Sequence, residues 1–98
     1  MGTPLITTID GTVPVEREEE LLDAYRQLNE EARPEGLLRS ELLRGKDGTW
    51  RIQTTWRDKE ALLALRRSGR PHTAQVLLDR VGVAHSPGMF TVEQSVEA

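Results

Sequence analysis

Two tryptophans and one histidine are the side chains of this sequence best suited to bind a planar molecule and move a proton. Residues 50–56 alternate in character, so a β-strand would carry Trp50, Thr54 and Trp56 on one face. A tryptophan at the end of a strand can stack on a planar ligand, although a large aromatic residue there also packs a core. The imidazole of His72, with an ordinary pKa of about 6.5, can accept a proton at neutral pH. We expect Trp56 and Thr54 to line a ligand cavity and His72 to be its general base; the alternative is that His72 points into solvent.

Tyr25, Arg39 and Arg51 are further candidates, each with a structural alternative. Tyr25 lies on the apolar stripe of a predicted helix, where its hydroxyl either faces the cavity or needs a partner in the core. Arg39 and Arg51 fall on predicted neighbouring strands, where they could hold an anionic oxygen or pair with Glu41 or Glu93. We expect Tyr25 and Arg51 to take part in ligand binding.

The remaining charged and sulfur-bearing positions give no metal signature. Arg66, Arg67 and Arg70 cluster near a predicted helix end, where they complement the negative end of the helix dipole and otherwise face solvent. His85 lies in a predicted loop, and two isolated histidines without a spaced carboxylate cluster do not predict a metal site. The absence of cysteine excludes disulfides, thiolate metal sites and cysteine nucleophiles. We expect no bound metal.

The composition limits the classes of protein to which the chain can belong. Its 98 residues fit one domain, residues 1–98. Thirteen Lys and Arg residues against sixteen Asp and Glu residues give a net charge of −3 with both signs interspersed, which argues against a nucleic-acid partner. No apolar run approaches the roughly 18 residues of a membrane helix, and the N-terminus lacks a leader pattern. We expect a cytoplasmic protein without a membrane partner.

Three stretches have the spacing of amphipathic helices. The first covers residues 16–32 and has four glutamates near its start, where they complement the positive end of the dipole. The second begins after Asp58, which suits an N-cap, and ends near residues 68–69. The third covers residues 71–81, where apolar residues follow the i, i+3, i+4, i+7 pattern.

Four stretches have strand character: residues 5–13, 36–44, 50–56 and 89–96. The pair Asp47-Gly48 predicts a tight turn that makes the second and third strands an antiparallel hairpin. Residues 83–88, which include Pro87, are interpreted as a connector. The element order is then β-α-β-β-α-β, which predicts an α+β, ferredoxin-like fold with a four-stranded antiparallel sheet.

The helices of such a fold cover only one face of the sheet. Leucine, isoleucine and valine from the four strands are expected on the other face, and the simplest cover is the same face of a second chain. Burial of about 1,600 Å² at roughly 25 cal/mol per Å² would supply the missing stabilisation. We therefore expect a homodimer formed through the sheet faces.

The segment Trp56-Arg57-Asp58-Lys59-Glu60-Ala61-Leu62 is similar to the start of the second helix in the antibiotic biosynthesis monooxygenase family, and the element order resembles that family over nearly the whole chain. The resemblance implies a dimeric α/β barrel built from two sheets, with a ligand cavity between sheet and helices in each subunit. It also implies oxygenation of an aromatic or polyketide-derived substrate, commonly without metal or flavin, so that no cofactor is expected.

Three functions remain open at this stage. The first is a cofactor-independent monooxygenase that uses dioxygen on a small aromatic ligand, with His72 as proton acceptor. The second is a non-catalytic protein of the same barrel that binds a small ligand or is purely structural. The third is an isomerase or cyclase, which needs the same base but no oxygen. An enzyme should have a closed cavity in which His72 or Arg51 faces the aromatic wall, whereas a cavity filled by leucine, methionine and phenylalanine side chains would favour a structural protein.

The haem-degrading relatives within this resemblance carry two features that can be checked here. They have an asparagine in the first strand and an iron-binding histidine in the second helical region. Residues 5–10 contain no asparagine, and His72 directly follows Pro71, which does not match that pattern. The sequence therefore disfavours haem binding.

Overall fold

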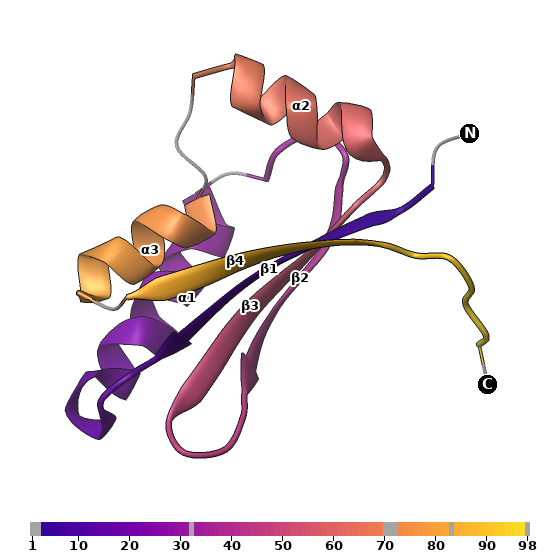
Figure 1. The fold of residues 1–98 in the computed structure, drawn as a ribbon. Helices are drawn as coiled ribbons and strands as arrows, with labels where there is room; N and C mark the ends of the chain where they lie inside the picture. Colours follow the sequence, from indigo (N-terminus) through magenta and orange to yellow (C-terminus); the bar gives the residue numbers. More distant parts are fainter. Residues whose placement is uncertain (1–2, 32, 70–72, 83, 98) are drawn as a thin grey trace.

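The computed structural model describes residues 3–31, 33–69, 73–82 and 84–97. Within these residues the elements are β1 (Leu5–Thr12), a 3-10 turn η1 (Val15–Arg17), α1 (Glu18–Glu31), β2 (Leu37–Arg44), β3 (Thr49–Trp56), α2 (Lys59–Arg67), α3 (Thr73–Val81) and β4 (His85–Thr91). The strands form one antiparallel sheet in the order β2-β3-β1-β4 (Figure 1). The predicted ferredoxin-like β-α-β-β-α-β arrangement is confirmed, and its second helical region consists of α2 and α3.

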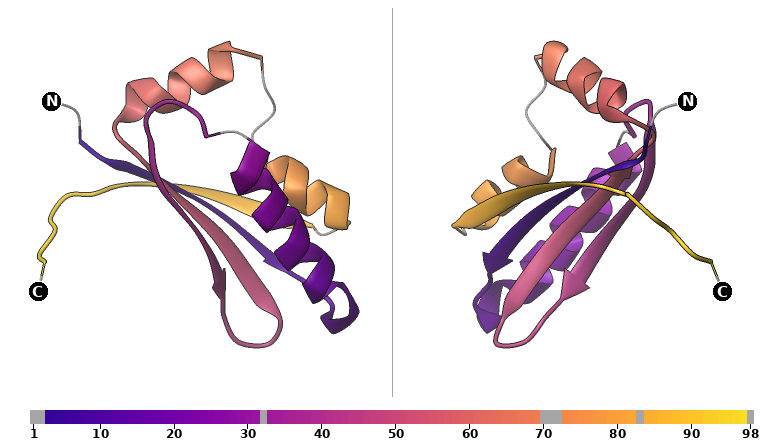
Figure 2. Two further views of the ribbon diagram at one scale, coloured as in Figure 1. Left: turned by 180° about the vertical axis from the view of Figure 1, so that it is seen from behind. Right: turned by 45° about the vertical axis from the view of Figure 1, so that its right-hand side comes forward.

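The three helices lie on one face of the sheet but cover different parts of it. Figure 2 shows α1 and α3 together over one part and α2 apart from them, near the other end of the strands. Two separate clusters of buried side chains correspond to these two covers. The larger contains Ile9, Val13, Leu21, Ala24, Trp50, Ile52, Leu77, Leu78 and Val81. The smaller contains Leu5, Trp56, Ala61, Leu62 and Leu65.

Local signals in the sequence correctly predicted several boundaries. The side chain of Asp58 caps α2 by accepting a hydrogen bond of 2.9 Å from the backbone N–H of Ala61. Asp47 and Gly48 both have positive φ, as a tight hairpin turn between β2 and β3 requires. The first helix differs slightly, because residues 15–17 form the 3-10 turn and α1 begins at Glu18. None of the described helices is long and apolar enough to cross a membrane.

The last strand lies elsewhere than predicted. The expectation was a strand over residues 89–96 after a connector, whereas β4 runs from His85 to Thr91 and includes Pro87. The strand is at the edge of the sheet, and Pro87, opposite Ile9 of β1, is tolerated there because an edge strand leaves half of its N–H groups without a sheet partner. The sequence pattern could not show that this segment is an edge strand.

The face of the sheet away from the helices, called here the open face, is more polar than predicted. Its charged and polar positions are Thr8, Asp10, Thr12, Arg39, Glu41, Thr49, Arg51, Gln53, Thr55 and Ser86. The expectation of a face rich in leucine, isoleucine and valine was wrong, because an irregularity between Leu37 and Arg39 aligns Leu37 with Trp56, and Leu42 packs against the larger cluster. Ile6, Leu43 and Phe90 remain on the open face.

Replacing Gly36 by alanine is expected to destabilise the fold. Gly36 has φ +84°, and a Cβ added there would collide with the Cβ of Ala61 on α2. The left-handed conformation and the forced displacement of α2 together should cost roughly 2–5 kcal/mol of unfolding free energy. Gly69→Ala is the matched control, since Gly69 has φ +76° with no atom within 4 Å of the added Cβ, and should cost only about 1–2 kcal/mol. Denaturant unfolding of both variants measures the difference; equal losses would contradict the predicted collision.

Candidate functional site

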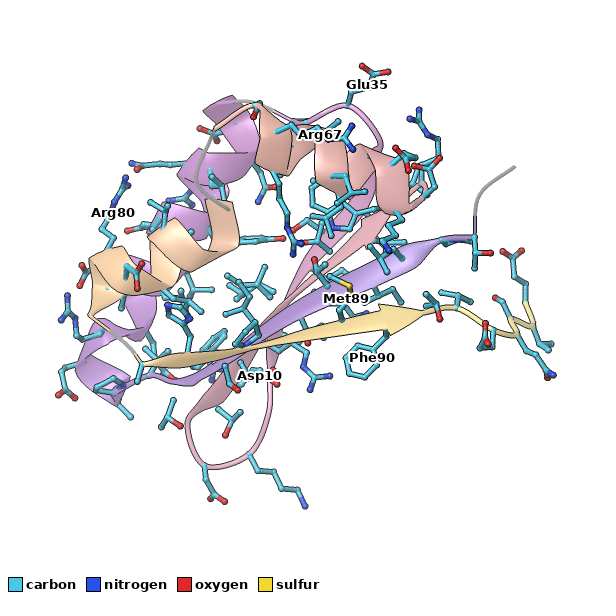
Figure 3. The ribbon with its side chains drawn as sticks, turned by 45° about the horizontal axis from the view of Figure 1, so that its top comes forward. Asp10, Glu35, Arg67, Arg80, Met89 and Phe90 are labelled. Atoms are coloured by element: carbon cyan, nitrogen blue, oxygen red, sulfur yellow. The ribbon has the colours of Figure 1, made fainter. Side chains whose placement is uncertain are left out.

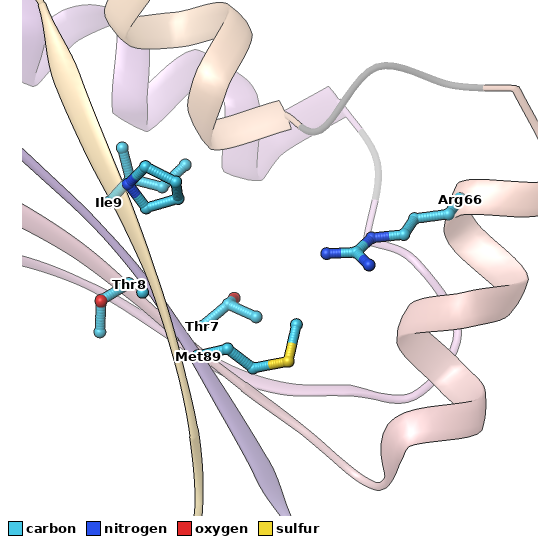
Figure 4. Close-up of a pocket in the computed structure, with 7 residues that line it drawn as sticks. Thr7, Thr8, Ile9, Arg66 and Met89 are labelled. Atoms are coloured by element: carbon cyan, nitrogen blue, oxygen red, sulfur yellow. The ribbon is translucent and has the colours of Figure 1, made fainter.

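A cavity of about 440 Å³ opens between the β1–β4 edge of the sheet and helix α2. The residues that line it are Thr7, Thr8, Ile9, Arg66, Pro87, Gly88 and Met89 (Figure 4). It lies on the helix-covered face, and its walls come from segments near the two ends of the chain and from the last turn of α2. The volume suits a small organic molecule.

The strand pairing explains the shape of the cavity. Thr7 pairs with Met89, and Ile9 pairs with Pro87, so that these two rows form opposite walls of the cavity. Between the rows the side chain of Thr8 points to the open face and its partner is Gly88, so the floor there is backbone. A backbone floor between mainly apolar walls suits a planar ligand.

A row of hydroxyl groups crosses the sheet beside the cavity, between the two apolar clusters. Ser40 pairs with Thr54, and Thr54 pairs with Thr7. The indole N–H of Trp56 donates a hydrogen bond of 3.0 Å to Oγ1 of Thr7, both side chains being buried. Because a buried indole N–H normally needs a partner, this bond fixes the hydroxyl of a residue that lines the cavity.

Of the predicted ligand-binding residues, Trp56, Thr54 and Tyr25 lie on the helix-covered side of the sheet, and none of them belongs to the described lining of the cavity. Trp56 is buried in the smaller cluster and reaches the cavity through Thr7. Thr54 is buried beside Thr7 in the hydroxyl row. Tyr25 is half-buried on α1, and its hydroxyl lies 2.6 Å from Oγ of Ser40, so it has the alternative role of a core tyrosine with a hydrogen-bond partner. Trp56 and Thr54 therefore adjoin Thr7 of the cavity lining, whereas Tyr25 lies against β2 at the opposite edge of the sheet from β4.

Arg51 lies on the open face, away from the cavity. Its guanidinium forms a salt bridge of 2.6 Å with Asp10, and this hydrogen bond, together with the carboxylate charge, raises the pKa of Arg51 above its usual value. Arg39 pairs with Glu41 at 3.6 Å, as the alternative interpretation had it. The two arginines are therefore held by carboxylates of their own sheet.

The two histidines are in different situations. His72 lies outside the described residues, in the segment that joins α2 to α3. His85 belongs to β4, and its Nε2 lies 2.8 Å from a carboxylate oxygen of Asp79 on α3. Within the described residues, no group of three or more His, Cys, Asp or Glu side chains is arranged to hold a metal ion.

Sequence reasoning missed most of the cavity lining. Met89 and Pro87 face the cavity only because β4 begins at His85 and pairs with β1, and this pairing joins segments about 80 residues apart. Arg66 belongs to the basic helix end that the sequence predicts, but no local pattern distinguishes it from Arg67. The sequence pattern correctly predicted that Trp56 lies at the junction of strand and helix. Its indole, however, packs into the core.

Comparison with known proteins identifies one family. A family model described as antibiotic biosynthesis monooxygenase matches residues 5–77, about three quarters of the chain. None of the curated proteins matches.

Several solved structures have the same fold. A mutant of SnoaB, a cofactor-independent oxygenase from Streptomyces nogalater, is 24% identical, covers 99% of this chain and 100% of its own, and has a TM-score of 0.73. The heme-degrading protein Rv3592 from Mycobacterium tuberculosis is 20% identical over 100% of both chains, with a TM-score of 0.71. A conserved protein from Methanosarcina mazei is 12% identical over 90% of this chain and 91% of its own, with a TM-score of 0.70. At these identities the similarity shows the fold alone.

Proposed function

The chain belongs to the antibiotic biosynthesis monooxygenase family, and from this membership we propose that it is a monooxygenase that oxidises a small aromatic or polyketide-derived molecule with dioxygen, without metal or flavin. The observation that carries the proposal is the unfilled cavity of about 440 Å³ between α2 and the β1–β4 edge. A purely structural protein would be expected to fill this space with leucine, methionine or phenylalanine side chains. Instead the cavity has a backbone floor and apolar walls.

The proposed reaction requires few specific types of residue. An activated ring methylene between two aromatic rings loses a proton, and the resulting carbanion gives electrons to dioxygen. Overall the methylene becomes a carbonyl, one oxygen atom enters the product, and the other leaves as water with the two hydrogens. The protein has to hold the ring, accept the proton and exclude water. Ile9, Pro87 and Met89 supply apolar surface for the first and third tasks.

We assign the role of proton acceptor to His72. The described lining of the cavity contains no carboxylate and no imidazole, so it offers no base that titrates near neutral pH. The chain has two histidines, and the other, His85, is paired with Asp79 and does not line this cavity. His72 follows α2 by a few residues, and the last turn of that helix carries Arg66 of the lining.

Haem chemistry fits the described residues poorly. Haem iron in proteins is held by histidine, cysteine, methionine or tyrosine. Among the described residues of the cavity lining, Met89 alone is of these types, and it is about half exposed. The sequence pattern also lacked the asparagine and the histidine placement of the haem-degrading relatives. No step of the proposed reaction passes through haem.

Family membership further supports a homodimer in which the open faces of two sheets meet. Phe90 is 56% exposed on that face, and Figure 3 shows Phe90 and Met89 on opposite sides of β4. Light scattering of the wild type is expected to give the mass of two 11.0 kDa chains. Phe90→Asp should give one chain, because an interface would bury its unpaired charge. Val15→Asp, at a 79% exposed site outside the sheet, should stay dimeric. A monomeric wild type would refute the dimer, and a dimeric Phe90→Asp would place the interface elsewhere.

Dioxygen uptake tests the proposed function. The protein, treated with chelator and free of flavin, is mixed with a panel of anthrones and hydroquinones in an oxygen electrode. A monooxygenase should consume oxygen at a rate proportional to protein concentration. Saturable binding of these compounds without uptake would support the alternative, a non-catalytic ligand-binding protein. Product formation without oxygen would support an isomerase or cyclase.

A further inference from the structure

Arg66 differs from the other arginines of the described residues in lining the cavity, and from most of them in having no ion pair. Its side chain extends from the last turn of α2 over the cavity, toward Thr7 and Met89 (Figure 4). Carboxylates lie within 4 Å of six other arginines, namely Arg17, Arg26, Arg39, Arg44, Arg51 and Arg57. Arg66 has no ion pair within the part of the chain that the structure describes. Its charge is therefore available to a ligand.

The charge in the described lining of the cavity is positive only. Its described lining contains Arg66 and no acidic residue, and the remaining lining residues are threonine, apolar side chains and glycine. A guanidinium next to low-dielectric walls attracts an anion more strongly than it would in open solvent. Complementing the α2 dipole does not require a cation at this site, because Arg67 occupies the same last turn without lining the cavity.

We propose that the cavity selects the anionic form of its aromatic ligand, with Arg66 donating hydrogen bonds to the anionic oxygen. The inference rests on the proposed function in taking this cavity as the ligand site. The backbone floor between the Thr7–Met89 and Ile9–Pro87 rows holds the ring, and the guanidinium fixes which edge carries the oxygen. The ligand chemistry is an oxyanion on a planar ring, either a phenolate or enolate or a carboxylate, since a guanidinium binds both.

Arg66 would then act as a specificity-determining residue for the proposed reaction. A substrate held as its anion is already electron-rich, so that dioxygen meets the form that gives up electrons most readily. A neutral ligand of the same shape keeps the apolar contacts but lacks the charge-assisted hydrogen bond. Selection of the anion should therefore be visible in binding alone, without turnover.

The phenolate arm of the test uses 4-nitrophenol, whose neutral and ionised forms differ in visible absorbance. Titration of the bound probe with the wild type should give a pKa about one unit below that of the free probe, which corresponds to about tenfold tighter binding of the phenolate. In Arg66→Gln the pKa of the bound probe should return to the free value or rise above it. Arg66→Lys should keep part of the shift. Arg67→Gln is the matched control and should behave as the wild type.

The carboxylate arm compares 2-naphthoate with the neutral 2-naphthamide by calorimetry. The wild type and Arg67→Gln should bind the carboxylate about tenfold more tightly than the amide, and Arg66→Gln should remove the preference while keeping affinity for the amide. A preference in one arm only identifies which oxyanion the site takes. No preference in either arm, a preference retained in Arg66→Gln, or no saturable binding to the wild type overturns the inference.

The outcome is separable from that of the proposed function. Oxygen uptake together with equal binding of charged and neutral probes would leave the monooxygenase proposal standing and refute selection by Arg66. A preference for the anion that depends on Arg66, without oxygen uptake from any substrate, would uphold the inference for a ligand-binding protein and count against the oxygenase.

Discussion

Trp56→Ala is expected to lower the free energy of unfolding by about 3–5 kcal/mol, since truncating a buried tryptophan removes its apolar contacts and leaves a cavity. Trp56 is 1% exposed and lies in the smaller cluster with Leu5, Leu62 and Leu65. The loss is a large fraction of the roughly 5–15 kcal/mol that stabilises a domain of this size. Urea unfolding followed by circular dichroism measures it. A loss below 1 kcal/mol would mean that the indole is not a central core residue.

A double-mutant cycle with Thr7 keeps this prediction testable if Trp56→Ala does not fold. Thr7→Val removes the acceptor of the 3.0 Å hydrogen bond and leaves the indole N–H buried without a partner, which should cost about 1–3 kcal/mol. Trp56→Phe with Thr7→Val should cost less than the sum of the two single changes, because neither polar group remains unpaired. Additive losses would contradict a coupling between the core and the cavity through this bond.

His72→Ala is expected to lower kcat by about 100-fold or more, because general-base catalysis contributes roughly 10²–10⁴ to the rate. The measurement is oxygen uptake at saturating substrate. His85→Ala is the matched control and should retain activity, since His85 pairs with Asp79 and does not line the cavity. Retained activity in His72→Ala would mean that another group accepts the proton.

The pH dependence gives an independent readout of the same base. An imidazole accepts a proton only in its neutral form, so kcat/KM should rise with pH and level off above the imidazole pKa, ordinarily about 6.5. The rising limb should be absent from the residual activity of His72→Ala. A limb that persists unchanged in the variant would report the ionisation of the substrate or of another residue.

The parts of the fold that depend on neighbouring residues were readable from the sequence. Asp58 caps α2 through Ala61, three residues away, and Asp47-Gly48 closes the hairpin between adjacent strands. The position of β4 was not readable, because Pro87 normally ends a strand and is allowed here only by the edge position of β4, which follows from the strand order. The irregularity in β2 could not be predicted from the sequence either. It directs Leu37 toward Trp56 and leaves the open face more polar.

The candidate site was predictable in its place but not in its lining. The alternation of residues 50–56 showed that Trp56 stands where the sheet meets α2, close to the cavity. It could not show that the indole packs into the core and donates a hydrogen bond to the Thr7 hydroxyl. Thr7 and Met89 face one cavity because β1 and β4 pair, a contact between chain ends that no local pattern encodes. The orientation of Arg66 likewise depends on how α2 lies over the sheet.

The most direct test of a monooxygenase site in this cavity is the fate of labelled oxygen. The protein is incubated with an anthrone under ¹⁸O₂, with chelator present and flavin absent, and the product is analysed by mass spectrometry. The expected product is a quinone that carries one ¹⁸O atom, formed in proportion to the protein and in much smaller amount when Met89→Trp fills the cavity. Label incorporated at the same rate without protein, or unaffected by filling the cavity, would contradict a monooxygenase site between α2 and the β1–β4 edge.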